Sequence, residues 1–336
     1  MGGVLILNLH ERRLLVANGA YSACALLLVG LSLLLAQLPL GSSYSLAYCL
    51  ATVAAEFAML GLPFGLCLSF PCMRSLPAWR RLFARPSALL WLVIPIAFTC
   101  YFVVNGLTVA WLGLLGLFGP TALVQTVPIP ESPLQLLLGS LVIGLAPALA
   151  EELFFRGAMQ GAYARLKPWV SILVVGVLFG MLHGQISALP GHVLLGVLLC
   201  ALVYWTGSIW PSMLLPFLQN TLAVGLSMAA QRMLELYKQL GMGDMLAQQE
   251  TALLSGGLST VLTGVSVAIG FGIPLAALLA LFYFLAKKRR PAAPPPPAPE
   301  EARVSPLCFL PLLPALLVIA FLYLNSTLAL YGLLPS

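Results

Sequence analysis

The sequence predicts an all-α fold, a polytopic bundle of about nine transmembrane helices. Of the 336 residues, 61% are hydrophobic and only 8% are charged, and the mean hydropathy is +1.02. Apolar runs of about 20 residues recur along the chain, which is the length that an α-helix needs to cross a bilayer. Because these runs are continuous rather than alternating, helices fit them and a closed β-barrel does not.

Three spans are expected in the N-terminal part, at Leu14–Leu38, Leu46–Phe70 and Leu89–Phe118. The segment Pro71–Pro86, between the second and the third, holds four arginines together with Trp79 and Phe83. Basic and aromatic residues in this arrangement are typical of an amphipathic segment in the headgroup layer of a membrane. A nucleic-acid patch can have the same composition, but a position between two spans favours the membrane.

Four spans are expected in the middle of the chain. One begins near Leu134 and runs into Glu151, and the next three lie at Trp169–Leu189, Val193–Trp205 and Ser212–Ala230. The turn between the fourth and the fifth span centres on Lys167-Pro168, since proline is accepted at the start of a helix but not in its interior.

Two more spans are expected after a polar connection. Gln231–Ser255 has mixed charge, and an eighth span follows at Leu258–Ala286. The basic cluster 287–290 then precedes the proline-rich stretch Pro291–Pro306, which should form a stiff extended linker without a core. The ninth span is expected at Leu307–Leu330.

These features divide the chain into five parts. Residues 1–132 form an N-terminal transmembrane region with the basic amphipathic loop 71–86, and residues 133–232 form the part that carries the candidate chemistry. Residues 233–286 hold the polar loop and the eighth span, residues 287–306 are the basic and proline-rich linker, and residues 307–336 contain the last span.

The distribution of positive charge supports this count. With the N-terminus in the cytoplasm, 13 of the 16 lysines and arginines lie on the cytoplasmic side, as the positive-inside rule requires. The basic residues that give the net charge of +6 are therefore expected to contact the anionic headgroups of the cytoplasmic leaflet. No nucleic-acid partner is expected. The seven scattered cysteines form no C-x-x-C pair and are expected to be buried thiols rather than metal ligands or disulfides.

The run Glu151-Glu152-Leu153-Phe154-Phe155-Arg156 places three ionised side chains within six residues of an apolar span. Ionised groups at membrane depth are costly and point to function. Glu152 and Arg156 are four residues apart, so they share one helix face and can pair. Glu151 is rotated by about 100° from Glu152 and is left free, which suits a general base.

Two polar residues in the following spans complete the candidate site. Glu152 precedes Lys167 by 15 residues and His183 follows Pro168 by 15, so two antiparallel helices of equal rise bring them to the same height. A carboxylate and an imidazole at one level can polarise a water molecule. Asn220, in a later span, carries an amide N–H that can stabilise a developing oxyanion.

Together these residues resemble the intramembrane endopeptidases of the CAAX-prenyl-protease and bacteriocin-processing family. The resemblance covers Gly139–Gly225 and consists of E-E-x-x-x-R, F-x-x-x-H from Phe179, T-G-S-I-W-P-S from position 206, and a downstream Asn. It implies that Glu151 and His183 activate water for hydrolysis of a peptide bond in a protein or peptide substrate. It also implies support from Glu152, Arg156 and Phe179, and oxyanion stabilisation by Asn220.

The chain departs from the family pattern at one position. The last motif of the family is H-x-x-x-N or H-x-x-x-D, and Pro216 stands where this histidine belongs. The family is commonly described as metalloproteases, but a zinc site here would keep only Glu151 or Glu152 with His183, fewer than the usual three protein ligands. We therefore favour metal-free activation of water, with a divalent metal such as zinc on Glu151 and His183 as the alternative.

Two other functions are open. Pro216 favours a catalytically impaired scaffold that binds a membrane-protein partner, and Glu56 with Glu151 would suit a proton-coupled carrier, although the sequence has no paired inverted repeats. His192 is expected at a membrane surface, with substitution for the missing histidine as its functional alternative. We expect an integral protein of a bacterial plasma membrane with its N-terminus in the cytoplasm.

Overall fold

The computed structural model describes residues 7–76, 87–119, 128–242, 257–288 and 304–333. Within these ranges every regular element is helical, and eight helices are long and apolar enough to cross a membrane. The shorter apolar helix Pro168–Leu182 makes the ninth. The predicted all-α polytopic bundle is therefore confirmed. Most of the amphipathic loop 71–86 and of the linker 287–306 lies outside the described residues.

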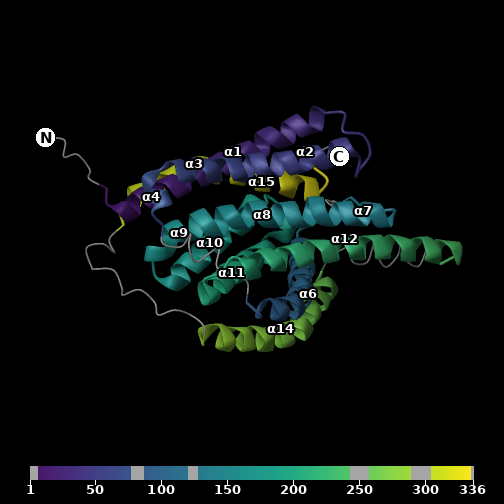
Figure 1. Ribbon diagram of the computed structural model, residues 1–336. Coiled ribbons are helices and arrows are strands. Elements are labelled where there is room, and N and C mark those ends of the chain that lie inside the picture. The colour runs from purple at the N-terminus through teal and green to yellow at the C-terminus, as the bar shows by residue number, and fades with distance from the viewer. Residues whose placement is uncertain (1–6, 77–86, 120–127, 243–256, 289–303, 334–336) are drawn as a thin grey trace.

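The helices follow one another along the chain as Figure 1 shows. The N-terminal elements are α1 (Leu9–Gln37), α2 (Leu46–Glu56), the π-helical η1 (Phe57–Gly61), α3 (Leu62–Ser69), α4 (Pro71–Arg74) and α6 (Leu90–Leu115). The fourth span consists of α7 (Pro133–Gly139), the π-helical η2 (Ser140–Leu145), α8 (Ala146–Glu152), the π-helical η3 (Leu153–Met159), α9 (Gln160–Ala162) and the short 3₁₀ turn η4 (Tyr163–Arg165). The later elements are α10 (Pro168–Leu182), η5 (Ile186–Ala188), α11 (Leu189–Thr206), α12 (Trp210–Gln239), α14 (Leu258–Lys287), η6 (Pro306–Leu312) and α15 (Leu313–Leu330).

The fourth span runs through the middle of the bundle (Figure 1). Helices α1, α2, α3 and α15 lie on one side of it, and α11 and α12 lie on the other, with α6 and α14 farther out. The central position explains why Phe154, Phe155 and Met159 of this span are almost completely buried. Side chains that project from it therefore meet other helices rather than lipid.

The start of the described chain and the start of its last span are tied together on α1. Asn8 and Glu11 form a capping box at its start, and the second carboxylate oxygen of Glu11 accepts a hydrogen bond of 2.9 Å from the backbone N–H of Ser305. Two turns further along α1, the side-chain amide of Asn18 donates to the carbonyl of Cys308 (2.8 Å) and its oxygen accepts from the Tyr163 hydroxyl (2.7 Å). These buried bonds hold the last span and the end of the fourth span against the first.

Helices α10 and α11 approach each other closely because glycines line their contact. A Cβ added to Gly180 would lie 2.6 Å from Cγ2 of Val193, and one added to Gly176 would lie 2.6 Å from Cγ2 of Val197. On α11, a Cβ on Gly196 would lie 2.4 Å from the carbonyl oxygen of Gly176. Small residues allow this backbone approach between membrane helices, and it fixes how the ends of α10 and α11 meet.

Two predicted boundaries are wrong. Helix α10 ends at Leu182 rather than at Leu189, because Gly184 adopts a positive φ of 64° that stops the helix. Helix α12 continues to Gln239 rather than ending at Ala230, so the first part of the expected polar connection is helical. As a consequence His183 is the C-terminal cap of its helix and not an interior residue.

Candidate active site

The helix that carries the Glu151 motif is irregular on both sides of it. Residues Ser140–Leu145 before the motif and Leu153–Met159 after its two glutamates are π-helical. Short π-helical stretches inside α-helices occur frequently at functional sites. Pro147 lies between them and has no N–H to offer the carbonyl four residues earlier, that of Ile143.

Asn220 compensates for this missing donor. Its side-chain Nδ2 donates a hydrogen bond of 3.1 Å to the carbonyl oxygen of Ile143, from α12 across to η2. Ile143 lies about two helical turns before Glu151. The structure thus brings the predicted oxyanion donor against the helix that carries the candidate base, and one of the two hydrogens of its amide is bound there.

Glu152 and Arg156 form the predicted ion pair. Oε1 of Glu152 lies 3.1 Å from Nη1 of Arg156, and both side chains are fully buried. The guanidinium also lies over the ring of Phe179, 4.6 Å from its centroid, and its Nη2 is 3.5 Å from the carbonyl oxygen of Gly196. Arg156 therefore links the fourth span to α10 and to α11, which is a positioning role.

Glu151 and His183 meet at the predicted height. Nε2 of His183 lies 3.9 Å from Oε1 of Glu151, and the two side chains keep 29% and 16% of their surface exposed. The opposite ring nitrogen, Nδ1, lies 3.0 Å from the carbonyl oxygen of Phe179. A carbonyl only accepts, so Nδ1 carries a hydrogen, and when the ring is neutral Nε2 presents a lone pair to Glu151.

His192 joins this group, although the sequence indicated a membrane surface. Its ring stacks on that of His183 with centroids 4.1 Å apart and planes 18° apart. Its Nδ1 is buried and has no hydrogen-bond partner. A signal was present in the sequence, because only eight residues separate the two histidines and they include Gly184 and Pro190.

Glu56 is a further carboxylate near the site. It is the last residue of α2, immediately before the π-helical η1, and its Oε1 is buried without a hydrogen-bond partner. Elements α2 and η1 pack against α8, and the Glu56 carboxylate is close enough to interact electrostatically with Glu151. The structure thus places Glu56 near Glu151, a proximity that the sequence did not reveal.

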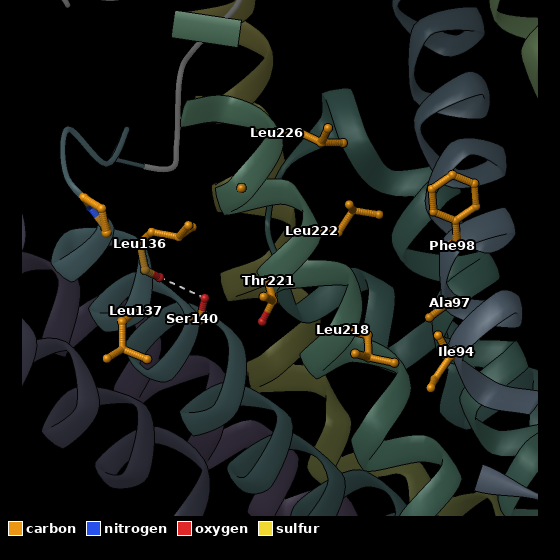
Figure 2. Close-up of a pocket in the computed structure, with 12 residues that line it drawn as sticks. Ile94, Ala97, Phe98, Leu136, Leu137, Ser140, Leu218, Thr221, Leu222 and Leu226 are labelled. Carbon is orange, nitrogen blue, oxygen red and sulfur yellow. Dashed lines mark hydrogen bonds between the residues drawn. The ribbon is translucent and has the colours of Figure 1, made fainter. Parts of the chain in front are cut away.

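An apolar groove of about 600 Å³ lies between α6, α7 and α12. Figure 2 shows its walls, which come from α7 with Leu136, from α12 with Leu222 and from α6 with Phe98. Thr221, the neighbour of Asn220, also lines it. The groove therefore offers an apolar chain a place between α6, α7 and α12, although neither Asn220 nor Ile143 lines it.

The residues at the site do not fit a metal centre of the usual kind. In the part of the chain that the structure describes, no group of three or more His, Cys, Asp or Glu side chains is placed to hold a metal ion. Structural and catalytic zinc sites ordinarily use at least three protein ligands. Glu151 and His183 provide two, so no step below passes through a metal.

Comparison with protein-family models identifies the same part of the chain. Residues 133–222 match the family described as Type II CAAX prenyl endopeptidase Rce1-like. This segment contains Glu151, His183 and Asn220 together with the buried ion pair. Comparisons with curated proteins and with solved structures gave no match. The resemblance seen in the sequence motifs is thus confirmed for residues 133–222, which match this family model.

Proposed function

We propose that the protein is an intramembrane endopeptidase that cleaves a peptide bond of a CAAX-type or other peptide-processing substrate through a water molecule activated by Glu151 and His183. The observation that carries this proposal is the distance of 3.9 Å between Oε1 of Glu151 and Nε2 of His183. It is too long for a direct hydrogen bond and leaves room for a shared partner. Both side chains also retain some exposure, which a water molecule needs in order to reach them.

The two groups are complementary to water in a specific way. The carboxylate and the Nε2 lone pair are both acceptors, because the hydrogen of His183 is held on Nδ1 by the Phe179 carbonyl. A water between them donates one hydrogen to each and turns its lone pairs toward a third atom. This orientation is the one that attack on a carbonyl carbon requires.

The proposed reaction then balances without further groups. The water oxygen bonds to the carbonyl carbon, one water proton passes to Glu151, and the π electrons of the carbonyl move to its oxygen. When the C–N bond breaks, the proton held by Glu151 passes to the leaving nitrogen. The second amide hydrogen of Asn220 is the proposed donor to the oxyanion.

The apolar groove supports a substrate with an apolar chain. The family is described as acting on prenylated CAAX ends, and the groove walls at Leu136, Leu222 and Phe98 are hydrophobic. A hydrocarbon chain gains about 0.8 kcal/mol for each CH₂ buried in such surroundings. We therefore propose that the groove holds the isoprenoid of a prenylated substrate while its peptide reaches Glu151.

We further propose that the protein resides in a bacterial plasma membrane with its N-terminus in the cytoplasm. With nine spans, this orientation places 13 of the 16 lysines and arginines on the cytoplasmic side. Reporter fusions to the connections after α1 and after α12 test it. Both connections should be external, and a cytoplasmic signal from either would contradict this orientation.

The function is tested with the purified protein in detergent or in liposomes. A prenylated CAAX peptide and its unprenylated form are incubated with the wild type and with E151Q, and products are identified by mass spectrometry. We expect one cleavage by the wild type and none by E151Q. Equal cleavage by E151Q would contradict the proposed base, and absence of cleavage by the wild type would contradict the CAAX substrate class.

A scaffold is the second candidate, and Pro216 favours it because the histidine of the last motif is missing. The distal part of α12 and its C-terminal cap have exposed apolar side chains, Met233, Leu236 and Leu240, that a membrane partner could cover. The variant P216H discriminates between the two candidates. A protease keeps or gains activity in P216H, whereas a scaffold cleaves nothing in either form.

A further inference from the structure

The proposed water mechanism uses only one of the two stacked histidines, His183, and leaves His192 without a role. His183 alone faces Glu151, yet a second imidazole lies parallel to it at 4.1 Å. A phenyl ring would fill this place without burying a nitrogen that has no partner. The choice of histidine therefore points to a polar task for its other nitrogen.

We propose that His192 donates a hydrogen bond from Nε2 to the carbonyl oxygen of the substrate. The inference rests on the proposed function and adds a catalytic residue to it. His192 lies on α11, outside all the family motifs in this chain.

The helix contact fixes this placement. Gly180 on α10 meets Val193 on α11 so closely that no Cβ fits between them. His183 is three residues beyond this contact and His192 is adjacent to it, so both rings emerge from the same end of the α10–α11 pair. Gly184 then turns the chain away at a positive φ, which leaves the ends of the two rings uncovered by a continuing helix.

The two rings differ in the nitrogen that carries hydrogen. His183 holds its hydrogen on Nδ1 against the Phe179 carbonyl, and its Nε2 accepts. Nδ1 of His192 is buried without an acceptor, and an orphaned buried N–H is rarer than an unsatisfied acceptor. The hydrogen of His192 is therefore assigned to Nε2, which makes one ring an acceptor for water and the other a donor.

This division of roles fits the hydrolysis step. As the water oxygen bonds to the carbonyl carbon and its proton passes to Glu151, negative charge develops on the carbonyl oxygen. The Nε2–H of His192 stabilises that charge without giving up its proton. When the C–N bond breaks, the carbonyl re-forms and the hydrogen bond weakens again, so His192 ends the step unchanged.

The tautomer is tested first, without any substrate. The chain has three histidines, so ¹⁵N-histidine NMR of the protein in detergent gives three imidazoles, which H10F and H192F assign. We expect His192 to show a protonated Nε2 and an unprotonated Nδ1, and His183 the reverse. A protonated Nδ1 on a neutral His192 would overturn the proposal even if the protein cleaves nothing.

A second experiment compares the kinetics of H192F with those of H10F. Phenylalanine preserves the stack on His183 but removes the donor, and His10 lies at the start of α1, away from the site. We expect kcat of H192F to fall about 10²–10³-fold with little change in KM, as for loss of one oxyanion donor, while kcat of H10F stays near that of the wild type. Thermal unfolding confirms that H192F is folded. A folded H192F with wild-type kcat would overturn the proposal, whereas an inactive wild type would instead contradict the proposed function.

Discussion

The side-chain amide of Asn220 donates a hydrogen bond of 3.1 Å to the carbonyl oxygen of Ile143, the carbonyl that Pro147 leaves without its helical donor. This contact joins α12 to the helix of Glu151 at the point where that helix becomes π-helical. Asn220 therefore has a structural task in addition to the proposed oxyanion contact. The two tasks can be separated experimentally.

The first prediction separates them with Pro147. N220A should lower both stability and kcat, because a buried carbonyl without a partner costs about 1–3 kcal/mol. In a P147A background the backbone N–H of residue 147 can bond to Ile143, so the stability cost of N220A should largely disappear. The loss of kcat should remain if Asn220 also contacts the oxyanion. Thermal unfolding and steady-state kinetics of the four proteins measure this, and full recovery of kcat in the double variant would leave Asn220 with the structural task alone.

The second prediction concerns the buried ion pair. E152A or R156A leaves one charge buried without its partner, so each should lower the free energy of unfolding by about 3–5 kcal/mol. The pair Arg232–Glu235 is the matched control, since its side chains are 57% and 44% exposed. E235A should change stability by no more than about 1 kcal/mol. Equal effects at the two pairs, measured by thermal or chemical unfolding in detergent, would show that the buried pair does not anchor the site.

The third prediction concerns the glycines between α10 and α11. G180A should separate the helices, because its Cβ would lie 2.6 Å from Cγ2 of Val193 and 2.7 Å from the backbone nitrogen of that residue. Both stability and activity should fall, since the contact holds His183 near Glu151. G270A is the control on α14, where an added Cβ meets nothing within 4 Å. It should stabilise the protein by about 0.4–1 kcal/mol. Normal activity in G180A would mean that the histidines do not depend on this contact.

The fourth prediction concerns the apolar groove. A Cβ on Gly225 would meet only Leu136, at 4.0 Å, so G225L should fold and fill part of the groove. Each CH₂ of an isoprenoid that loses burial costs about 0.8 kcal/mol, so the KM for a prenylated peptide should rise about tenfold. The KM for the unprenylated peptide should not change. A rise for both peptides, or for neither, would place the prenyl chain elsewhere.

The sequence predicted the contacts that follow from helical periodicity within one span and from the position of the turn between two consecutive spans. The spacing of four residues predicted the Glu152–Arg156 ion pair, and in the structure Oε1 of Glu152 lies 3.1 Å from Nη1 of Arg156. Equal distances from the turn at Lys167-Pro168 predicted that His183 would meet the glutamate motif, and it meets Glu151. Both inferences needed only the rise of a helix and the position of a turn.

The features that the sequence did not reveal depend on which faces of the helices pack against one another. The stack of His192 on His183 follows from the glycine contact of α10 with α11, and periodicity within either helix says nothing about which glycines meet. The same holds for Glu56, whose neighbour Glu151 is 95 residues away in the chain. The π-helical stretches likewise cannot be predicted from a hydropathy pattern. Pro147 indicates only that a carbonyl one turn earlier lacks its helical hydrogen-bond donor.

The most direct test of the account is a double-mutant cycle on Glu151 and His183. We predict that E151Q and H183N each lower kcat by at least about 10²-fold and that the double variant is no slower than the slower single variant, because groups that act as a unit on one water are not additive. Thermal unfolding serves as the fold control for all three variants. Additive losses, or wild-type kcat in either single variant, would contradict joint activation of one water by these two residues.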